Sequence, residues 1–290
     1  MNNLVIGSTG KIGTYYLIKS KYKFNIFTSR KRSSDKKIIF LPLNINKIRN
    51  FLKKERISTV VILTAISNPK QCKDNLEYSK KINVIFIKNL IKLLIKLKLY
   101  FIFFSSEYVY PDTLNTKKKF TENSKIQTRM IYGKQKIYIE KYLKKNRYKN
   151  YSVLRLAKTY GNELNDQTLF TSILNKYKKG KKNFNVANDQ FFRPLYINDL
   201  IKIIDIFVKN KIKGIYNVSG NTFKSRYDLI KLMIKTLKIK DININKCSIK
   251  EFGKNVYYPT RLNLSNSKIK KKLNFKFSDL TSVIKKLDES

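Results

Sequence analysis

A tyrosine and a lysine four residues apart, Tyr132 and Lys136, are the pair of side chains in this chain best suited to acid–base chemistry. Residues i and i+4 of a helix lie on the same face, so we expect the two side chains to be neighbours. A phenol with its ordinary pKa of about 10 exchanges protons poorly at neutral pH. A neighbouring ammonium stabilises the phenolate and lowers that pKa. We therefore predict that Tyr132 and Lys136 form a general acid/base pair.

A glycine-rich stretch near the N-terminus indicates where a nucleotide would bind. Three of the chain's 9 glycines fall in one short window directly after the apolar run 4–6. In a strand-to-helix turn of this kind, backbone N–H groups and the positive end of the helix can meet a pyrophosphate. Ile12 stands where a phosphate-binding P-loop needs Ser or Thr, which excludes that alternative. The predicted cofactor contacts in this loop are Gly7, Thr9, Gly10, Lys11, Ile12 and Gly13.

The residues after the second predicted strand indicate which dinucleotide is used. Folds that prefer NAD commonly end this strand with an acid, whereas a basic residue accommodates the 2′-phosphate of NADP. This chain has Arg30, Lys31 and Arg32 at that place, and the competing interpretation is a solvated loop. We predict NADPH (NADP), with NAD as the alternative. The remaining predicted cofactor contacts, besides Arg30, Lys31, Tyr132 and Lys136, are Asn44, Ile45, Leu63, Thr64 and Ala65.

Two serines, Ser105 and Ser106, follow the apolar strand predicted over 100–104. They stand at the carboxyl edge of the sheet, where open α/β sheets bind ligands. A hydroxyl at this place can orient a substrate carbonyl. Two serines after a strand are otherwise ordinary turn residues, so it is their combination with Tyr132 and Lys136 that favours a catalytic role.

Short apolar runs alternate with segments of helical period in the first half of the chain, which predicts an α/β fold with a Rossmann doubly wound parallel sheet. The predicted strands are 3–6, 24–28, 38–41, 59–63, 100–104 and 152–156, and the predicted helices are 12–19, 47–55, 76–97 and 131–145. We predict a NAD(P)-binding Rossmann domain over 1–157, with parts of 190–220 packing back on it. The looser pattern over 158–290 predicts a smaller C-terminal α+β domain that mainly binds substrate.

The net charge of +44, from 63 Lys and Arg against 19 Asp and Glu, would ordinarily suggest a nucleic-acid or membrane partner. The lysines are spread along the whole chain, so we attribute the charge to compositional drift and expect no specific nucleic acid and no membrane partner. Without His, and with two cysteines far apart, no metal site is expected. Cys72 and Cys247 are expected to be structural. The early first strand predicts a cytoplasmic protein without a signal peptide.

These segments together resemble the extended short-chain dehydrogenase/reductase family, and within it the dTDP-4-dehydrorhamnose reductase group. The resemblance covers nearly the full chain, and its specific part is the combination of Ser106, Tyr132 and Lys136. The segments that carry it are Gly7–Gly13, Leu63–Ile66, Ser105–Tyr110, Thr121-Glu122, Tyr132–Lys136, Arg155–Gly161, Asp189-Gln190, Gly214–Gly220 and Arg261–Ser267.

The resemblance implies a role for each member of that combination. Ser106 would polarise the substrate carbonyl, Tyr132 would donate a proton to its oxygen, and Lys136 would bind the nicotinamide ribose while lowering the tyrosine pKa. NADPH would deliver hydride to the carbonyl carbon. The implied protein is an NADPH-dependent reductase of a nucleotide-linked 4-keto-6-deoxy sugar, in dTDP-rhamnose and polysaccharide biosynthesis, with a homodimer as its candidate assembly.

Two departures from the family's pattern bear on the substrate. The related 4,6-dehydratases carry an Asp-Glu pair after the hydroxyl residue, whereas this chain has Glu107-Tyr108, which argues against dehydration. Where the rhamnose-forming reductases have a Gly-Ser-Pro-Thr-like stretch, the segment 191–196 of this chain is closer to segments of nucleotide-sugar epimerases and other extended members. Its Arg193 is a candidate for the substrate diphosphate, because a guanidinium binds phosphate oxygens bidentately, and the alternative is a salt bridge to a nearby carboxylate. The predicted substrate contacts are Ser106, Glu107 and Arg193.

The sequence is also compatible with two other functions. An NAD-retaining nucleotide-sugar 4-epimerase would use the same acid/base pair and keep its cofactor bound. A non-catalytic, cofactor-binding regulatory subunit would keep the fold for contact with a partner, although such a role does not need an intact set of Ser106, Tyr132 and Lys136.

Overall fold

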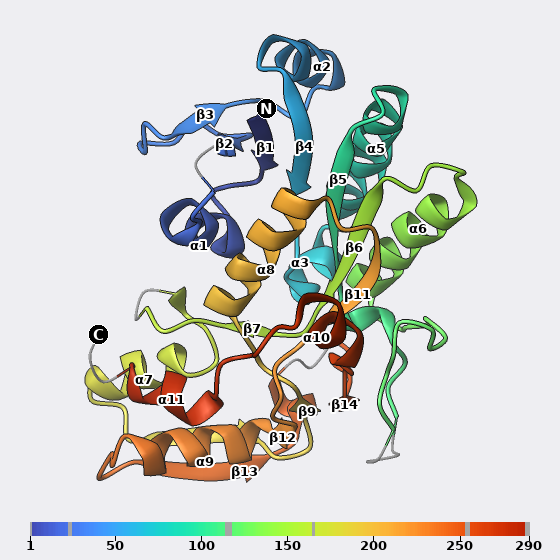
Figure 1. Cartoon of the computed structure of the whole chain (residues 1–290). Helices are drawn as coiled ribbons and strands as arrows, with labels where there is room; N and C mark the ends of the chain where they lie inside the picture. The colour runs from blue at the N-terminus through green and yellow to red at the C-terminus, as the bar shows by residue number, and fades with distance from the viewer. Residues whose placement is uncertain (1, 23–24, 114–117, 164–165, 253–255, 288–290) are drawn as a thin grey trace. The chain divides into compact units, whose positions relative to one another are not determined.

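The computed structural model describes residues 2–22, 25–113, 118–163, 166–252 and 256–287 and divides the chain into two compact units (Figure 1). The first unit groups residues 1–109, 131–155 and 200–216, and the second groups 110–130, 156–199 and 217–290. The predicted first domain, 1–157, includes the segment 110–130, whereas the structure groups this segment with the second unit. That segment is held by the second unit, since Phe120 N donates to Asn263 O at 2.8 Å.

The first unit is built around a seven-stranded sheet with the strand order β11-β6-β5-β4-β1-β2-β3. The pairings of β1 with β2, β1 with β4, β2 with β3, and β4 with β5 are all parallel. The strands are β1 (Asn2–Ile6), β2 (Asn25–Ser29), β3 (Ile38–Phe40), β4 (Ile57–Ile62), β5 (Tyr100–Ser106), β6 (Tyr151–Leu156) and β11 (Gly214–Val218). The predicted α/β class with a doubly wound sheet is confirmed, and β11 is a strand that the prediction left out.

The strand order reverses between β1 and β4, because the chain runs outward from β1 through β2 and β3 and then returns to β4 on the other side. At such a switch point the loops after two neighbouring strands separate, and ligands bind in the crevice beyond their carboxyl ends. The glycine stretch follows β1 and the segment 63–66 follows β4. Both predicted cofactor-binding segments therefore lie at the switch point.

Helices cover both faces of this sheet (Figure 1). On one face α2, α5 and α6 pack together over a core that includes Ile48, Leu90 and Ile139. On the other face α1 and α8 are linked where Ser20 Oγ donates to Asp205 at 2.7 Å. The helical elements are α1 (Lys11–Lys19), α2 (Ile45–Lys54), α3 (Pro69–Asp74), α4 (Leu76–Lys80), η1 (Lys81–Phe86), α5 (Ile87–Lys96), η2 (Glu107–Val109), α6 (Ile131–Lys145) and α8 (Ile197–Asn210).

The continuous helix predicted over 76–97 is interrupted in the middle. Residues Lys81–Phe86 form a π-helix, η1, between the α-helices α4 and α5. Single π-helical turns inside α-helices occur frequently at functional sites. The hydrophobic period alone did not reveal this turn, because Ile82, Phe86 and Leu90 keep the helical spacing of buried residues across it.

The second unit consists of short strands and helices around its own core, which includes Phe170, Phe184 and Met233. Its small sheets have the orders β10-β7, β12-β9-β14 and β13-β8. The elements are β7 (Thr159–Tyr160), α7 (Thr171–Lys178), β8 (Asn183–Ala187), β9 (Phe191–Phe192), β10 (Leu195–Tyr196), β12 (Lys224–Ser225), α9 (Arg226–Thr236), β13 (Asn243–Cys247), η4 (Ile249–Phe252), β14 (Arg261–Leu262), α10 (Ser267–Leu273) and α11 (Leu280–Lys285).

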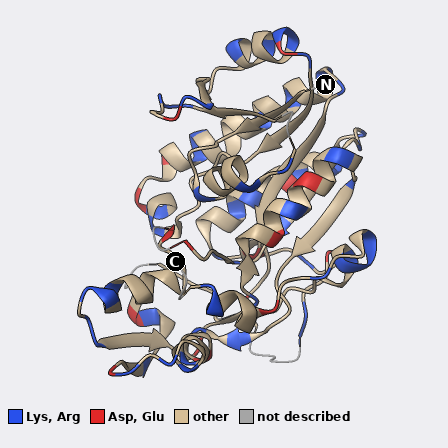
Figure 2. Ribbon diagram, turned by 60° about the vertical axis from the view of Figure 1, so that its left-hand side comes forward, with Lys and Arg blue, Asp and Glu red and all other residues tan. Residues whose placement is uncertain are grey.

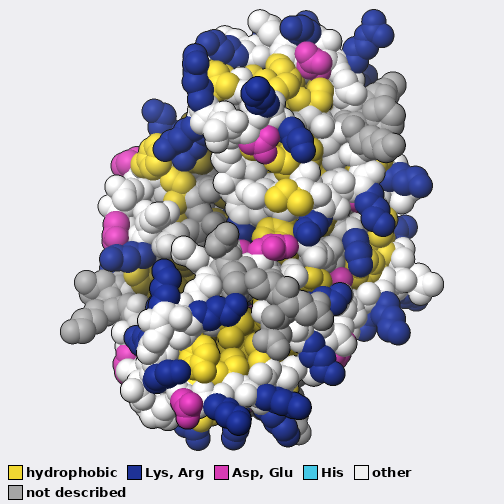
Figure 3. Space-filling view, turned by 90° about the vertical axis from the view of Figure 1, so that its left-hand side faces the viewer, with side chains coloured by type: hydrophobic (Ala, Val, Ile, Leu, Met, Phe, Trp, Pro, Cys, Tyr) yellow, Lys and Arg dark blue, Asp and Glu magenta, His cyan; other side chains and the backbone are white. Residues whose placement is uncertain are grey.

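Lysine and arginine occur on the helices and loops of both units (Figure 2). On the face drawn in Figure 3 their side chains are scattered among polar and hydrophobic ones and form no single basic patch. Proteins that bind nucleic acid concentrate their charge on one face. Among the described residues, no helix is both long enough and apolar enough to cross a bilayer.

Candidate active site

Two glycines, Gly7 in the loop between β1 and α1 and Gly13 near the start of α1, leave no room for a side chain. Gly7 has a φ of +98°, and a Cβ there would lie 2.6 Å from Thr64 N. A Cβ at Gly13 would lie 2.6 Å from the carbonyl oxygens of Gly7 and Ser8. Both distances are shorter than real contacts, so these glycines allow β1, α1 and the segment after β4 to approach one another closely.

The same loop leaves the start of α1 open to an anion. Gly10 is the N-cap residue of α1, and no side chain caps the helix there. A Cβ at Gly10 would meet Gly7 O at 3.5 Å, an ordinary contact, so folding does not require glycine here. A glycine that the fold does not need, at the positive end of a helix, fits the close approach of a pyrophosphate.

The end of β2 carries basic side chains and no carboxylate. Ser29 closes the strand, and its Oγ lies 3.2 Å from both Thr9 Oγ1 and Lys31 N. The Arg30 guanidinium donates to Tyr78 OH at 2.5 Å and lies over that ring. Without an acid to accept the ribose hydroxyl, this end of the sheet suits a 2′-phosphate better. The cofactor roles of Thr9, Arg30 and Lys31 stay predictions.

The other predicted cofactor contacts form hydrogen bonds or packing contacts within the fold. Asn44 Oδ1 accepts hydrogen bonds of 3.0 Å from Asn46 N and Lys47 N and so caps α2, while the partly buried Ile45 packs against the core. Leu63 N donates to Ile6 O at 2.9 Å, which aligns the start of 63–65 with the end of β1. These contacts account for Asn44 and Ile45 without a cofactor, whereas 63–65 lies directly beside the glycine loop.

The two adjacent serines at the end of β5 differ in their contacts. Ser105 Oγ donates to Glu140 Oε1 at 2.5 Å, and both residues are buried. Ser106 Oγ accepts a weaker bond of 3.3 Å from Tyr108 N. The structure therefore uses Ser105 to hold β5 against α6 and leaves Ser106 as the candidate for a substrate carbonyl. The buried Glu107 follows it as the first residue of η2.

Tyr132 and Lys136 lie on one face of α6, as their spacing predicts. Lys136 Nζ is 5.4 Å from the centre of the Tyr132 ring and 4.7 Å from that of Phe103 in β5. Both side chains are buried, with 8% and 2% of their surfaces exposed. α6 packs against β5, which ends at Ser106, and against η2, which follows it, so the elements that carry the three predicted catalytic residues are in contact.

Protonation of this pair differs from the sequence-based expectation. Burial raises the pKa of the Tyr132 phenol above its ordinary value of 10.0, where we expected Lys136 to lower it. Burial also lowers the pKa of Lys136 from 10.5 to about 8, against the opposing effects of Cys72 and Glu140. The expectation counted the ammonium and left out desolvation, which acts on both groups. Tyr132 therefore holds its proton firmly at neutral pH.

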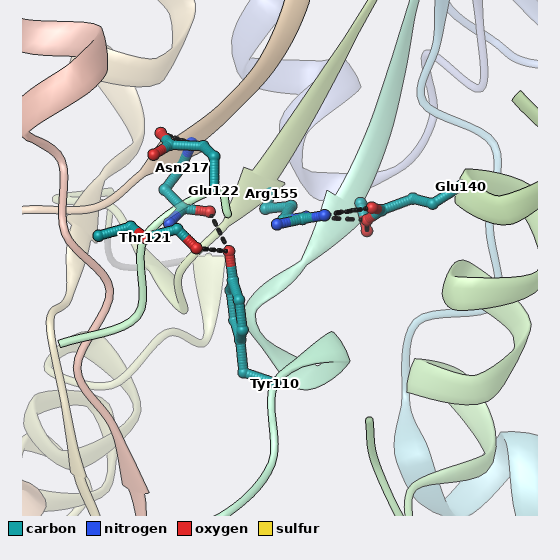
Figure 4. Close-up of polar contacts among 7 residues, drawn as sticks. Tyr110, Thr121, Glu122, Glu140, Arg155 and Asn217 are labelled. Atoms are coloured by element: carbon teal, nitrogen blue, oxygen red, sulfur yellow. Dashed lines mark hydrogen bonds and ion pairs between the residues drawn. The ribbon is translucent and has the colours of Figure 1, made fainter. Parts of the chain in front are cut away.

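A buried ion pair joins α6 to β6. Arg155 Nη2 donates to Glu140 Oε2 at 2.6 Å, and Arg155 Nε donates to both carboxylate oxygens at 3.1 Å (Figure 4). Glu140 follows Lys136 by one helical turn, and Arg155 lies in β6. This carboxylate is paired and hydrogen-bonded on both sides, as a buried charge must be.

Arg193, the predicted contact for a diphosphate, lies in the second unit. Its Nε donates to Asn263 Oδ1 at 2.7 Å, its Nη1 bonds Asn221 O, and its guanidinium lies over the Phe223 ring. Among the described residues no carboxylate forms an ion pair with it, and burial lowers its pKa. The alternative salt bridge to Asp189 or Asp199 is therefore not formed in the described structure. A half-buried cation held by neutral amides fits an anionic ligand.

Several polar residues around the site were not predicted from the sequence. Cys72, Ser79, Asn83 and Gln135 form a buried hydrogen-bonded cluster beside Tyr132 and Lys136, and Glu140 and Arg155 form the ion pair. Of the two cysteines expected to be structural, Cys72 is buried and Cys247 is partly exposed. One signal in the sequence could have revealed Gln135 and Glu140. Both are polar residues on the same face of the predicted helix as Tyr132 and Ile139, where core residues are expected.

Comparisons with known proteins agree with this architecture. A family model described as the RmlD substrate binding domain matches residues 1–289. A Bacillus anthracis dTDP-4-dehydrorhamnose reductase in complex with NADP superposes with a TM-score of 0.82 at 18% identity, over 99% of each chain. A Bacillus anthracis dTDP-glucose 4,6-dehydratase in complex with NAD gives a TM-score of 0.83 at 18% identity, over 100% of this chain and 96% of that one.

One relative is named as a subunit of another enzyme and not as an oxidoreductase. Methionine adenosyltransferase 2 subunit beta of Xenopus tropicalis is 23% identical over 234 residues, which cover 78% of this chain and 69% of that protein. At these levels of identity the solved structures establish the fold, and the family model establishes the family.

Proposed function

From the premise that this chain belongs to the family of the RmlD substrate binding domain, we propose that it is an NADPH-dependent reductase of a nucleotide-linked 4-keto-6-deoxy sugar. The observation that carries the proposal is that α6, with Tyr132 and Lys136 on one face, packs against β5, which ends at Ser106, in the same unit as the glycine loop. The dTDP-4-dehydrorhamnose reductase in complex with NADP supports both the substrate class and the cofactor.

The residues of the glycine loop and of the β2 end are those that would hold the dinucleotide. Gly10 would admit the pyrophosphate to the start of α1, and Arg30 with Lys31 would bind the 2′-phosphate. The bound NADPH would supply hydride to the carbonyl carbon of the sugar. The guanidinium of Arg193, which has neutral partners, would bind the diphosphate of the substrate.

Proton delivery would come from the side chains at the end of β5. Ser106 Oγ would donate a hydrogen bond to the carbonyl oxygen and so favour the charge that develops on it. Tyr132 would give the phenolic proton to the same oxygen as the hydride arrives. The raised pKa of Tyr132 means that this proton is present at neutral pH, and the nearby ammonium of Lys136 would stabilise the phenolate that remains.

The family match favours reduction over the epimerase alternative. The matching family model is that of the RmlD substrate binding domain, and dTDP-4-dehydrorhamnose reductases are among the similar solved structures. Dehydration lacks support as well, since Glu107 and Tyr108 follow Ser106 in place of an Asp-Glu pair.

A regulatory subunit is the second candidate, and a specific observation favours it. The curated relative is named as a subunit of methionine adenosyltransferase. In that case the chain would bind a dinucleotide and a partner enzyme without turnover. The presence of Ser106, Tyr132 and Lys136 on elements that pack together is the argument for catalysis, because partner binding alone does not need this combination.

One assay separates these functions. NADPH oxidation is followed by absorbance with dTDP-, UDP-, GDP- and CDP-linked 4-keto-6-deoxy sugars, for the wild type and for Tyr132→Phe. Turnover that the variant lacks supports the reductase and identifies the nucleotide. Tight NADPH binding without oxidation of any of these sugars contradicts the reductase and favours the subunit, whereas interconversion of 4-epimers without added reductant favours the epimerase.

A further inference from the structure

Tyr78 is a large aromatic residue that is exposed and yet makes two contacts with a side chain far away in the sequence. It lies in α4, and 48% of its surface is exposed. Its hydroxyl accepts a hydrogen bond of 2.5 Å from Arg30 Nη1, and the guanidinium carbon of Arg30 lies 5.7 Å from the centre of its ring. A planar guanidinium that is both bonded to a phenol and stacked on an aromatic ring is restrained in position and in orientation.

This contact joins the two halves of the doubly wound sheet. Arg30 directly follows β2, whereas Tyr78 lies in the second helix after β4. In the sheet, β2 and β4 are the two neighbours of β1, and the glycine loop follows β1. Arg30 and Tyr78 therefore belong to the two segments that follow the neighbours of β1, on either side of the strand that leads into the predicted pyrophosphate site.

Three basic residues follow β2, and they are held to different degrees. Lys31 and Arg32 are exposed, and the Arg32 guanidinium lies over the ring of Phe40, which is itself exposed. Arg30 is half-buried, and its guanidinium is both hydrogen-bonded to and stacked on a residue of α4. A side chain that is already ordered loses less conformational freedom when a ligand binds. Of the three, Arg30 is therefore the best prepared for a fixed contact with a ligand.

The contact with Tyr78 keeps the positive charge of Arg30 available to an anion. In the described part of the chain no carboxylate forms an ion pair with Arg30, and Glu77, the neighbour of Tyr78, is paired with Lys80 at 3.8 Å instead. A tyrosine hydroxyl orients a guanidinium without neutralising it. The bond to Tyr78 also occupies only one of the five N–H donors of the guanidinium, which leaves others for phosphate oxygens.

We propose that Tyr78 determines the preference for NADPH over NADH, because it holds the Arg30 guanidinium where this group meets the 2′-phosphate of the cofactor. The inference rests on the proposed function for the role of Arg30 and deepens it. Tyr78 is a positioning residue, since it acts through Arg30 and does not itself contact the phosphate.

The test is a titration of the free protein with NADPH and with NADH, which differ only in the 2′-phosphate. Tyr78→Leu removes both the ring and the hydroxyl, and we expect the Kd for NADPH to rise about fivefold while the Kd for NADH stays unchanged. Tyr78→Phe keeps the ring and removes only the hydroxyl, so the Kd for NADPH should rise by a smaller factor, about twofold.

A double-mutant cycle shows whether Tyr78 acts through Arg30. In the Arg30→Ala background, Tyr78→Leu should not change the Kd for NADPH any further, because the guanidinium that Tyr78 positions is absent. If the ring of Tyr78 instead stacked directly on the adenine, Tyr78→Leu would weaken NADPH and NADH equally and would do so in both backgrounds. That result would overturn the inference.

Tyr138→Leu is the matched control. Tyr138 is exposed to a similar extent, 46%, and its hydroxyl accepts a hydrogen bond of 3.1 Å from Lys88 Nζ, which also lies 5.6 Å from the centre of its ring. This pair of a tyrosine and a cation joins α5 to α6 and involves no residue at the end of β2. The variant should therefore keep the wild-type Kd for both dinucleotides.

The outcomes separate this inference from the proposed function. An unchanged ratio of the two Kd values in Tyr78→Leu, or an equal change of that ratio in Tyr138→Leu, overturns the role of Tyr78. Wild-type protein that binds NADH more tightly than NADPH overturns it as well, because no preference for the 2′-phosphate then exists. Wild-type protein that binds NADPH but reduces no keto sugar contradicts the reductase, while the ratios of the Kd values still decide the role of Tyr78.

Discussion

The hydroxyl of Ser105 donates a hydrogen bond of 2.5 Å to Glu140 Oε1, so the two adjacent serines at the end of β5 have different tasks. Ser105 binds a buried carboxylate of α6. Ser106, its neighbour, is the serine that we propose to donate to the substrate carbonyl. The pair offers a matched comparison between a structural role and a proposed catalytic role of the same residue type.

Ser106→Ala should lower kcat about 100-fold or more with little change in stability, because one hydrogen bond to the developing oxyanion is lost. Ser105→Ala should keep most of the activity and lower the free energy of unfolding by about 1–3 kcal/mol, because Glu140 loses a donor. Steady-state NADPH oxidation and urea unfolding measure the two effects. A larger loss of kcat in folded Ser105→Ala would reverse the assignment.

The ion pair of Glu140 and Arg155 is buried, so removal of one partner should be costly. Arg155→Met leaves an uncompensated carboxylate and should destabilise the protein by roughly 3–5 kcal/mol. The control is the exposed pair of Glu77 and Lys80, at 3.8 Å, for which Glu77→Gln should change stability by less than about 1 kcal/mol. Denaturant unfolding of both variants gives the comparison, and equal effects would mean that burial does not determine the strength of the pair.

The lowered pKa of Lys136 predicts a specific pH dependence of stability. Between about pH 8 and its ordinary pKa of 10.5, the unfolded chain binds a proton at Lys136 that the folded chain does not. The contribution of Lys136 to stability therefore increases as the pH rises through this window. Lys136→Met should be more stable than the wild type at pH ~7, and the difference should shrink by about 2 kcal/mol at pH ~9.5. Denaturant unfolding at both pH values is the measurement. A difference that stays constant between the two would show that Lys136 has an ordinary pKa.

Arg30 should determine the preference between NADPH and NADH. Its replacement by Ala removes a cation at the end of β2, and we expect the Kd for NADPH to rise about tenfold or more while the Kd for NADH stays nearly constant. Arg49→Ala removes the same charge from the exposed side of α2 and controls for the general attraction of a basic protein for anions. Titration with both dinucleotides gives the ratio. A parallel change for NADPH and NADH in Arg30→Ala would exclude a specific contact with the 2′-phosphate.

Gly10, at the N-cap of α1, and Gly13, within α1, should respond differently to the same added methyl group. Gly13→Ala places a Cβ 2.6 Å from two carbonyl oxygens and should destabilise the fold by about 2 kcal/mol or more. Gly10→Ala makes only an ordinary contact at 3.5 Å and should fold like the wild type, but it should weaken NADPH binding because the methyl group occupies the start of α1. Thermal unfolding and NADPH titration separate the two. If Gly10→Ala binds NADPH like the wild type, the pyrophosphate does not approach this position.

Much of the first unit could be predicted because its signals are local. The apolar runs at Leu4–Ile6 and Tyr100–Phe104 and the helical period of 131–145 identify strands and a helix within a few residues of their observed bounds. The spacing of Tyr132 and Lys136 and that of the three glycines are also local signals, because each involves residues only a few positions apart in the chain. These features follow from the geometry of a single element.

The tertiary structure decided what depends on residues far apart in the chain. The sequence determined the α/β class, the glycine loop and the shared face of Tyr132 and Lys136. Only the fold could show that desolvation outweighs the ammonium in the pKa of Tyr132, that Ser105 and Ser106 differ, and that Asn83 joins Ile66 to Gln135. Burial and hydrogen bonding in a core arise from packing between elements, and a one-dimensional pattern carries no record of which side chains that packing brings into contact.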